Sequence, residues 1–195
     1  LAVVEAAPAR RIVRWAALLH DVGKGMPGVR HVEGEKITDY NHDHVGAAMA
    51  EEILRRWRFP EKDVHQIAWL VANHMKFHYF ANVQEADVVK WVRRLAMQRE
   101  FASQKELIGT IREMTDLCKA DIIGCGRPFS ATEGHEAFGR CMMDVAASIP
   151  VSVGELHYDR RTIEALGPAV AEGMKNLLLR VQTGELKNEP DRLYR

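Results

Sequence analysis

A histidine and a carboxylate stand side by side at the end of an apolar helical run, as His20 and Asp21. Both side chains are ligands of first-row transition metals, and such an adjacent pair is hard to explain by packing alone. Gly23 and Lys24 follow at once, where a phosphate can approach the backbone and an ammonium group together. This segment therefore predicts a metal-dependent site that acts on a phosphate group.

Further ligand candidates lie downstream. His20, His74 and Asp121 each continue the apolar face of their own helix, and His42 precedes a helix. Taken singly, an inward histidine is more often a hydrogen-bonded core residue, and an inward aspartate can pair with an arginine. Their joint occurrence favours metal binding. The predicted ligands are His20, Asp21, His42, His74 and Asp121.

The order His42-Asp43-His44 leaves two histidines to choose from. Asp43 can cap the following helix, which presents His42 from the loop and places His44 on the first turn. We predict that His42 is the ligand, and that His44 and His78 contact the substrate. His78 lies one helical turn beyond His74. The other histidines show no convergent context and are interpreted as surface or structural residues: His31, His65, His135 and His157.

A carboxylate shared by two cations fixes them close together, and such a pair activates water for in-line attack on phosphorus. Mixed imidazole and carboxylate ligation favours Mn, Fe, Co, Ni or Zn over Mg or Ca. We therefore expect one or two divalent cations as cofactor, with Mg kept as an option. Asp21 and Lys24 are the expected catalytic residues, because Lys24 can neutralise a phosphoryl oxygen. A solvated loop lysine is the equally weighted alternative.

The elements that must position these residues are helical almost throughout, so the predicted fold class is all-α. Helices are expected at about residues 12–20, 44–57, 61–74, 84–97, 103–122, 130–147 and 168–184. A loop rich in glycine and charge covers residues 25–41, and residues 151–158 alone have strand character. The residues expected on the apolar face are Ile12, Trp15, Ala16 and Leu19 in the first helix, Val45, Met49, Ile53 and Trp57 in the second, and Val64, Ile67, Ala68 and Val71 in the third.

The composition and charge of the chain exclude several classes of protein. The chain has 195 residues, 47% of them apolar, and its formal net charge is zero, so no global field draws it to nucleic acid. No apolar run approaches the ~20 residues of a membrane span. Three cysteines without a Cys-x-x-Cys pair suit reduced thiols in a cytoplasmic protein. The chain opens with Leu1 rather than Met, which predicts a piece of something longer.

Two basic clusters surround tryptophans: Arg55 and Arg56 adjoin Trp57, and Arg93 and Arg94 follow Trp91. The favoured interpretation is a solvated helix face with snorkelling side chains. The alternative is RNA binding by these four arginines.

The predicted ligands and the residues around them resemble a known family. His20-Asp21-Val-Gly-Lys24 resembles the signature of the HD-domain metal-dependent phosphohydrolases, an all-α superfamily. By this resemblance His42 and His74 match two further family histidines, and Asp121 matches a late aspartate. Both histidines together imply a two-metal site. The early histidine of the family would lie just upstream of Leu1, and no residue here matches it.

The resemblance is sharper over residues 14–24 and 42–60, which are similar to the HD region of bacterial CCA-adding tRNA nucleotidyltransferases and poly(A) polymerases. Residues 166–188 are similar to the tail that follows. This resemblance implies a helical HD metal-binding domain over residues 1–128 and a small helical, RNA-contacting extension over residues 129–195. It also implies hydrolysis of 2′-, 2′,3′-cyclic or related phosphoesters in tRNA 3′-end maturation or repair.

A nucleotidyltransferase head, with its Gly-rich strand turn and paired carboxylates, is absent from the sequence. The chain is therefore not expected to add nucleotides, and an N-terminal nucleotidyltransferase domain is expected in a longer parent. Two other interpretations stay open. One is a non-catalytic RNA-binding or assembly module, whose helix start at Gly167-Pro168 can seat a phosphate. The other is a stand-alone HD nucleotide phosphohydrolase. The expected partners are a phosphoester or nucleotide substrate and tRNA, without a membrane.

Overall fold

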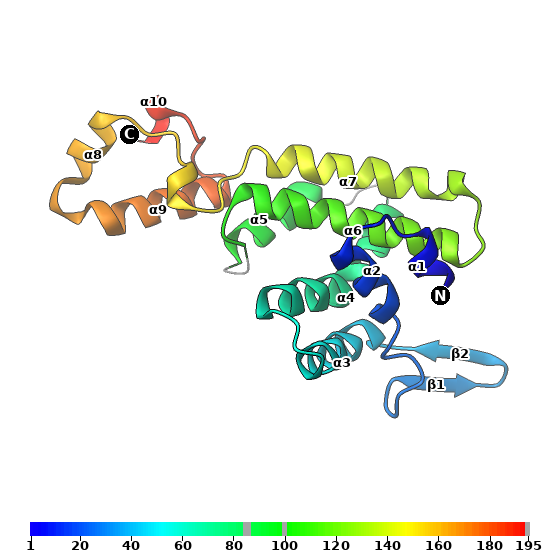
Figure 1. The fold of residues 1–195 in the computed structure, drawn as a ribbon. Helices are drawn as coiled ribbons and strands as arrows, with labels where there is room; N and C mark the ends of the chain where they lie inside the picture. Colours follow the sequence, from blue (N-terminus) through cyan, green and yellow to red (C-terminus); the bar gives the residue numbers. More distant parts are fainter. Residues whose placement is uncertain (84–86, 99–100, 194–195) are drawn as a thin grey trace. The chain divides into compact units, whose positions relative to one another are not determined.

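The computed structural model of the protein describes residues 1–83, 87–98 and 101–193. Most of these residues are helical, and one short antiparallel hairpin is the β-structure among them (Figure 1). The predicted all-α class is confirmed. No helix in the described ranges is long and apolar enough to cross a membrane.

The chain divides into two compact units. The first comprises Leu1–Ala86 and Arg112–Gly139, and the second Asp87–Ile111 and Arg140–Arg195. The long helices α6 (Gln104–Gly124) and α7 (Glu133–Ala146) therefore contribute residues to both. The predicted division into an HD domain over 1–128 and an extension over 129–195 stays a prediction.

The first unit is a helical bundle in which α4 contacts both α2 and α3. Its helices before α6 are α1 (Ala2–Ala6), α2 (Arg11–Leu19), α3 (His42–Arg56) and α4 (Glu61–Ala81). Between α6 and α7 lies the 3-10 helix η1 (Phe129–Thr132). The expected apolar faces of two helices are confirmed, since Ala16 and Leu19 of α2 and Val64, Ile67 and Val71 of α4 are buried. Helix α4 extends past the predicted end at residue 74, so His78 lies on the same helix as His74.

The predicted inward face of α3 is wrong. The buried residues are His42, Gly46, Ala50 and Leu54, and Trp57 is 54% exposed. Small residues at 46 and 50 let α3 approach its neighbours closely, and this outweighs the larger apolar side chains of the adjoining face. The ring of Trp57 packs edge-on against Trp15 at the surface, with ring centroids 5.1 Å apart.

The β-structure lies elsewhere than predicted. Strands β1 (Arg30–Glu33) and β2 (Lys36–Asp39) pair antiparallel within the expected loop, with Arg30 opposite Asp39. Both strands are largely exposed and lack the alternating burial that reveals a strand in sequence. Residues 151–158 form no strand, because the Glu155 carboxylate accepts hydrogen bonds from the backbone of Val151 and Ser152, which stabilises the 3-10 helix η2 (Val153–Glu155).

The second unit has its own small core. Besides parts of α6 and α7 it contains α5 (Val88–Met97), α8 (Arg160–Leu166), the 3-10 helix η3 (Gly167–Ala169), α9 (Val170–Thr183) and α10 (Pro190–Leu193). Its buried cluster comprises Leu156, Met174, Leu177, Val181 and Leu193. The predicted helix over 84–97 is described only from residue 87 onward, where Asp87 caps α5 by accepting a hydrogen bond from Lys90 N.

Candidate metal centre

Three histidines of the first unit are oriented by the same local device. The Nδ1–H groups of His20, His42 and His74 each donate a hydrogen bond to the carbonyl three residues earlier, at 2.9, 2.8 and 2.7 Å. All three side chains are buried. Because Nδ1 is occupied, each ring turns its Nε2 away from its own backbone, as metal-binding histidines require.

The hairpin takes part in this arrangement through Asp39 at the end of β2. The Asp39 carbonyl accepts the hydrogen bond from His42, while its carboxylate accepts one from Gly25 N at 2.9 Å. Arg30 pairs with the same carboxylate and helps to hold the pKa of Asp39 below its ordinary value. Asp39 therefore ties the loop that follows Lys24 to the ring of His42.

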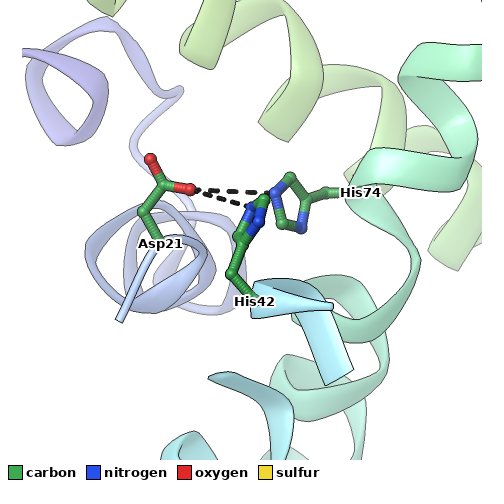
Figure 2. A group of neighbouring side chains, drawn as sticks. All are labelled: Asp21, His42 and His74. Atoms are coloured by element: carbon green, nitrogen blue, oxygen red, sulfur yellow. Dashed lines mark ion pairs between the residues drawn. The ribbon is translucent and has the colours of Figure 1, made fainter. Parts of the chain in front are cut away.

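The Asp21 carboxylate lies between His20 on one side and the pair His42 and His74 on the other. Its Oδ1 is 3.3 Å from His42 Nε2 and 4.0 Å from His74 Nε2, and its Oδ2 is 3.3 Å from His20 Nε2. Figure 2 shows the first group, in which Asp21, His42 and His74 offer ligand atoms within 4.8 Å of one another. Each carboxylate oxygen thus faces a different set of nitrogen donors.

Asp121 of α6 adjoins His20 from a distant part of the sequence. Its Oδ1 lies 3.3 Å from His20 Nε2, and its Oδ2 lies 3.1 Å from His78 Nε2. The Cys125 thiol donates a hydrogen bond to Oδ1 at 3.5 Å. The five predicted ligands therefore lie in one connected cluster.

Gly23 explains how α3 can approach the end of α2. A Cβ at this position would collide with the carbonyl oxygen of His42 and lie 2.8 Å from Gly46 N. The space beside Gly23 is filled by the first turns of α3. Glycine at this position therefore serves a contact between two backbone segments, and the approach of a phosphate to this backbone stays a prediction. That contact brings Asp21 beside His42.

The histidines and carboxylates of the cluster change one another's pKa. Burial disfavours the charged form of His20, but Asp121 and Asp21 outweigh it and raise its pKa to about 10. Burial likewise opposes ionisation of the two carboxylates, yet His20 contacts hold the pKa of Asp21 and of Asp121 well below the ordinary value. Burial lowers the pKa of His74 to about 4.

These shifts predict the pH dependence of the metal-free protein. The raised pKa of His20 stabilises the fold below pH 6.5, and this contribution is lost as the pH rises toward about 10. The lowered pKa of His74 has the opposite sign, since stability is lost as the pH falls from 6.5 toward about 4. We expect the free energy of unfolding, measured by urea titration with a chelator, to peak near pH 6.5. His20→Gln should flatten the alkaline limb, and an unchanged limb would contradict the assignment.

The residues present fit a divalent cation. Nε2 of His20 and Nε2 of His42 are buried without a well-aligned hydrogen-bond partner, although their Nδ1 atoms are satisfied. Donor atoms around a cation at bond lengths of about 2.1 Å lie roughly 3 to 3.5 Å apart, which the separations from Asp21 and Asp121 approach. Buried, unpartnered nitrogens facing carboxylates are typical of metal ligands.

Lys24, His44 and His78 are the remaining predicted site residues, and they differ in their distance from the cluster. Lys24 Nζ pairs with Asp21 Oδ2 at 2.7 Å and is partly exposed, so it lies at the edge of the cluster. His44 is exposed on the first turn of α3, away from these contacts. His78 is brought into the cluster by Asp121.

The four predicted RNA-binding arginines are divided between the units. In the first unit, Arg55 pairs with Glu51 and Glu61, while Arg56 is exposed. In the second unit, Arg94 is exposed. The guanidinium of Arg93 lies where a Cβ on Gly184 would be, so it packs against the backbone at the end of α9.

His135 lies beside the cluster, although the sequence analysis did not include it in the site. It is 3% exposed, and its Nε2 lies 2.9 Å from His78 Nδ1. Burial, followed by the charge of His78, lowers its pKa to about 4. Thr132 and Met142, spaced at three and seven residues from it, are also buried. The inward position that singled out His74 would have singled out His135.

A helical bundle that gathers buried histidines and aspartates around a candidate cation site is the architecture of HD domains. These domains bind divalent metals and are generally phosphohydrolases. The HD domain family model matches residues 4–122, and the chain belongs to this family.

Curated relatives extend the comparison. The chain is 29% identical over 182 residues to an A-adding tRNA nucleotidyltransferase of Deinococcus radiodurans, covering 90% of this chain and 38% of that protein. It is 29% identical over 120 residues to a bifunctional uridylyltransferase/uridylyl-removing enzyme of Rhodopseudomonas palustris, covering 61% of this chain and 11% of that enzyme. The chain thus spans well under half the length of these relatives. No solved structure matches.

Proposed function

We propose that this chain is a metal-dependent phosphohydrolase module of a longer protein similar to a tRNA nucleotidyltransferase. The expected substrates are 2′-, 2′,3′-cyclic or related phosphoesters, and the expected setting is maturation or repair of tRNA 3′ ends. Likeness to the A-adding enzyme over 90% of the chain supports the setting. The name of the uridylyl-removing relatives supports the chemistry, since removal of a uridylyl group cleaves a phosphoester.

The observation that carries the proposal is the division of Asp21 between two donor groups. Oδ1 faces His42 and His74, and Oδ2 faces His20. A carboxylate that offers one oxygen to each of two donor groups would be suited to serve two cations. When bound, such cations supply Lewis-acid stabilisation of a phosphoryl group and an activated water.

The side chains of this protein divide the remaining tasks. His42 and His74 would hold one cation with Asp21, while His20 and Asp121 would hold the other. Lys24 stands at the exposed edge, 2.7 Å from Asp21 Oδ2. From that edge the Lys24 ammonium would be the group that pairs with an anionic phosphoryl oxygen. His44 and His78 stay candidates for contacts with the rest of the substrate.

The test is a hydrolysis assay on the whole chain. The substrates are bis(p-nitrophenyl) phosphate, 2′,3′-cyclic AMP and 2′-AMP, with Mn, Ni, Co or Mg added. Loss of an outer partner alone costs metal sites about 10–100-fold, so we expect His20→Ala and Asp21→Ala to lose more than about 100-fold. His65→Gln, on the exposed side of α4, is the control and should keep wild-type activity. Equal activity in wild type and both alanine variants would reject the proposal.

A second candidate function is RNA contact through Arg56 and Arg94, both exposed. Arg55 is less suited because Glu51 and Glu61 already engage it. Phosphate contacts by such side chains make affinity fall with salt. We expect the Arg56→Gln/Arg94→Gln variant to bind a tRNA more weakly and with a shallower salt dependence. Affinity and salt slope equal to wild type would speak against RNA contact at these positions.

A further inference from the structure

A buried histidine and a partly buried one adjoin the candidate metal centre. His78 of α4 and His135 of α7 lie with ring centroids 4.9 Å apart, and His78 Nδ1 is 2.9 Å from His135 Nε2. One ring therefore donates a hydrogen bond to the other, and this bond joins α4 to α7. This contact fixes the orientation of both rings, because a ring nitrogen left without a hydrogen-bond partner inside a protein is unfavourable.

The second nitrogen of His78 faces Asp121. His78 Nε2 lies 3.1 Å from Asp121 Oδ2, without the alignment of an ideal hydrogen bond. A nitrogen lone pair at that distance from an ionised carboxylate would be repelled, so we assign a proton to Nε2. The contact holds Oδ2 and leaves Oδ1 facing His20 at 3.3 Å.

His78 differs from the other histidines of the cluster in how its ring is held. His20, His42 and His74 each use a carbonyl three residues earlier, which is a local contact within one segment. His78 Nδ1 instead reaches a side chain on α7, 57 residues away in sequence. The orientation of His78 therefore depends on His135.

We propose that His135 is a positioning residue of the metal centre, acting through His78 on the Asp121 carboxylate. This inference rests on the proposed function, because it presumes that Asp121 serves a cation. Outer partners that orient a ligating carboxylate typically change metal affinity by about 10–100-fold. His135 would thus tune the position shared by His20 and Asp121 without contacting the cation.

The test uses the whole chain and Co²⁺, whose visible absorption reports the geometry of its ligands. His135→Leu removes the hydrogen bond to His78, and we expect it to weaken Co²⁺ binding about 10-fold and to alter the spectrum. The side-chain amide in His135→Gln can donate or accept a hydrogen bond near the position of Nε2. This variant should restore the affinity for Co²⁺ to within about threefold of wild type. Calorimetry supplies the affinities independently of any hydrolysis assay.

Thr132→Val is the matched control. Thr132 is fully buried beside the start of α7, and the change removes its hydrogen bond to the Phe129 carbonyl, which involves neither His78 nor Asp121. We expect it to lower stability in urea without changing Co²⁺ affinity. Wild-type affinity in His135→Leu would overturn this inference alone, as would a failure of His135→Gln to rescue. Absence of Co²⁺ binding to the wild type would overturn the proposed function as well.

Discussion

Asp21→Asn is expected to abolish cation binding at both donor groups. The substitution keeps the shape of the side chain but removes the charge that Oδ1 offers to His42 and His74 and that Oδ2 offers to His20. An amide presents one weak oxygen ligand and a nitrogen that cannot bind a cation. We expect affinity for Mn²⁺ or Co²⁺, measured by calorimetry, to fall by more than about 100-fold, since even outer-partner losses reach that size. Hydrolysis should fall to background.

Asp43→Asn is the matched control for this prediction. Asp43 lies on the first turn of α3, next to His42, and carries the same charge outside the cluster. Its replacement should leave cation affinity and hydrolysis within about twofold of wild type, since surface charges are worth little. If both variants lost affinity equally, the net charge of the region rather than ligation by Asp21 would explain the result.

Gly23→Ala is expected to be the most damaging single-methyl change near the centre. The added Cβ would collide with the His42 carbonyl and lie 2.8 Å from Gly46 N, and both atoms belong to the backbone of α3. Backbone cannot rotate aside as a side chain can, so α3 must shift away from Asp21. Overpacking of this kind costs about 1–3 kcal/mol or more. We expect this loss in the free energy of unfolding by urea, together with weaker Co²⁺ binding.

Gly109→Ala separates this collision from a general effect of the substitution. Gly109 lies inside α6, where an added Cβ would meet nothing within 4 Å. Alanine is favoured over glycine inside a helix by about 1 kcal/mol, so this variant should be as stable as wild type or slightly more stable. Wild-type stability and metal binding in Gly23→Ala would show that α3 does not need the close approach.

Local periodicity was enough to predict much of the scaffold. The spacing of apolar residues placed Ile67 and Val71 on the inward face of α4, and both are buried. The same spacing put His74 in line with them, and His74 is 1% exposed. Periodicity works here because a helix fixes the direction of each side chain relative to its neighbours three and four residues away.

The wrong predictions share a physical cause. Trp57 was expected to face the core, yet the contact surface of α3 is formed by the small residues Gly46 and Ala50. The exposed β-hairpin over residues 30–39 carries no burial pattern that a sequence can reveal. In both cases the outcome depends on which surfaces meet, and that is a property of pairs of elements rather than of one.

The sequence by itself determined the helical class, the kinds of ligand available and the inward direction of several of them, because these follow from residue type and helical spacing. Only the tertiary structure decided that Asp21 turns one oxygen to His42 and the other to His20, and that His135 reaches Asp121 through His78. Such contacts join residues from distant parts of the chain, as with His20 of the first segment and Asp121 of α6. They exist only after the helices have packed, and the close approach of Gly23 to α3 is part of that packing.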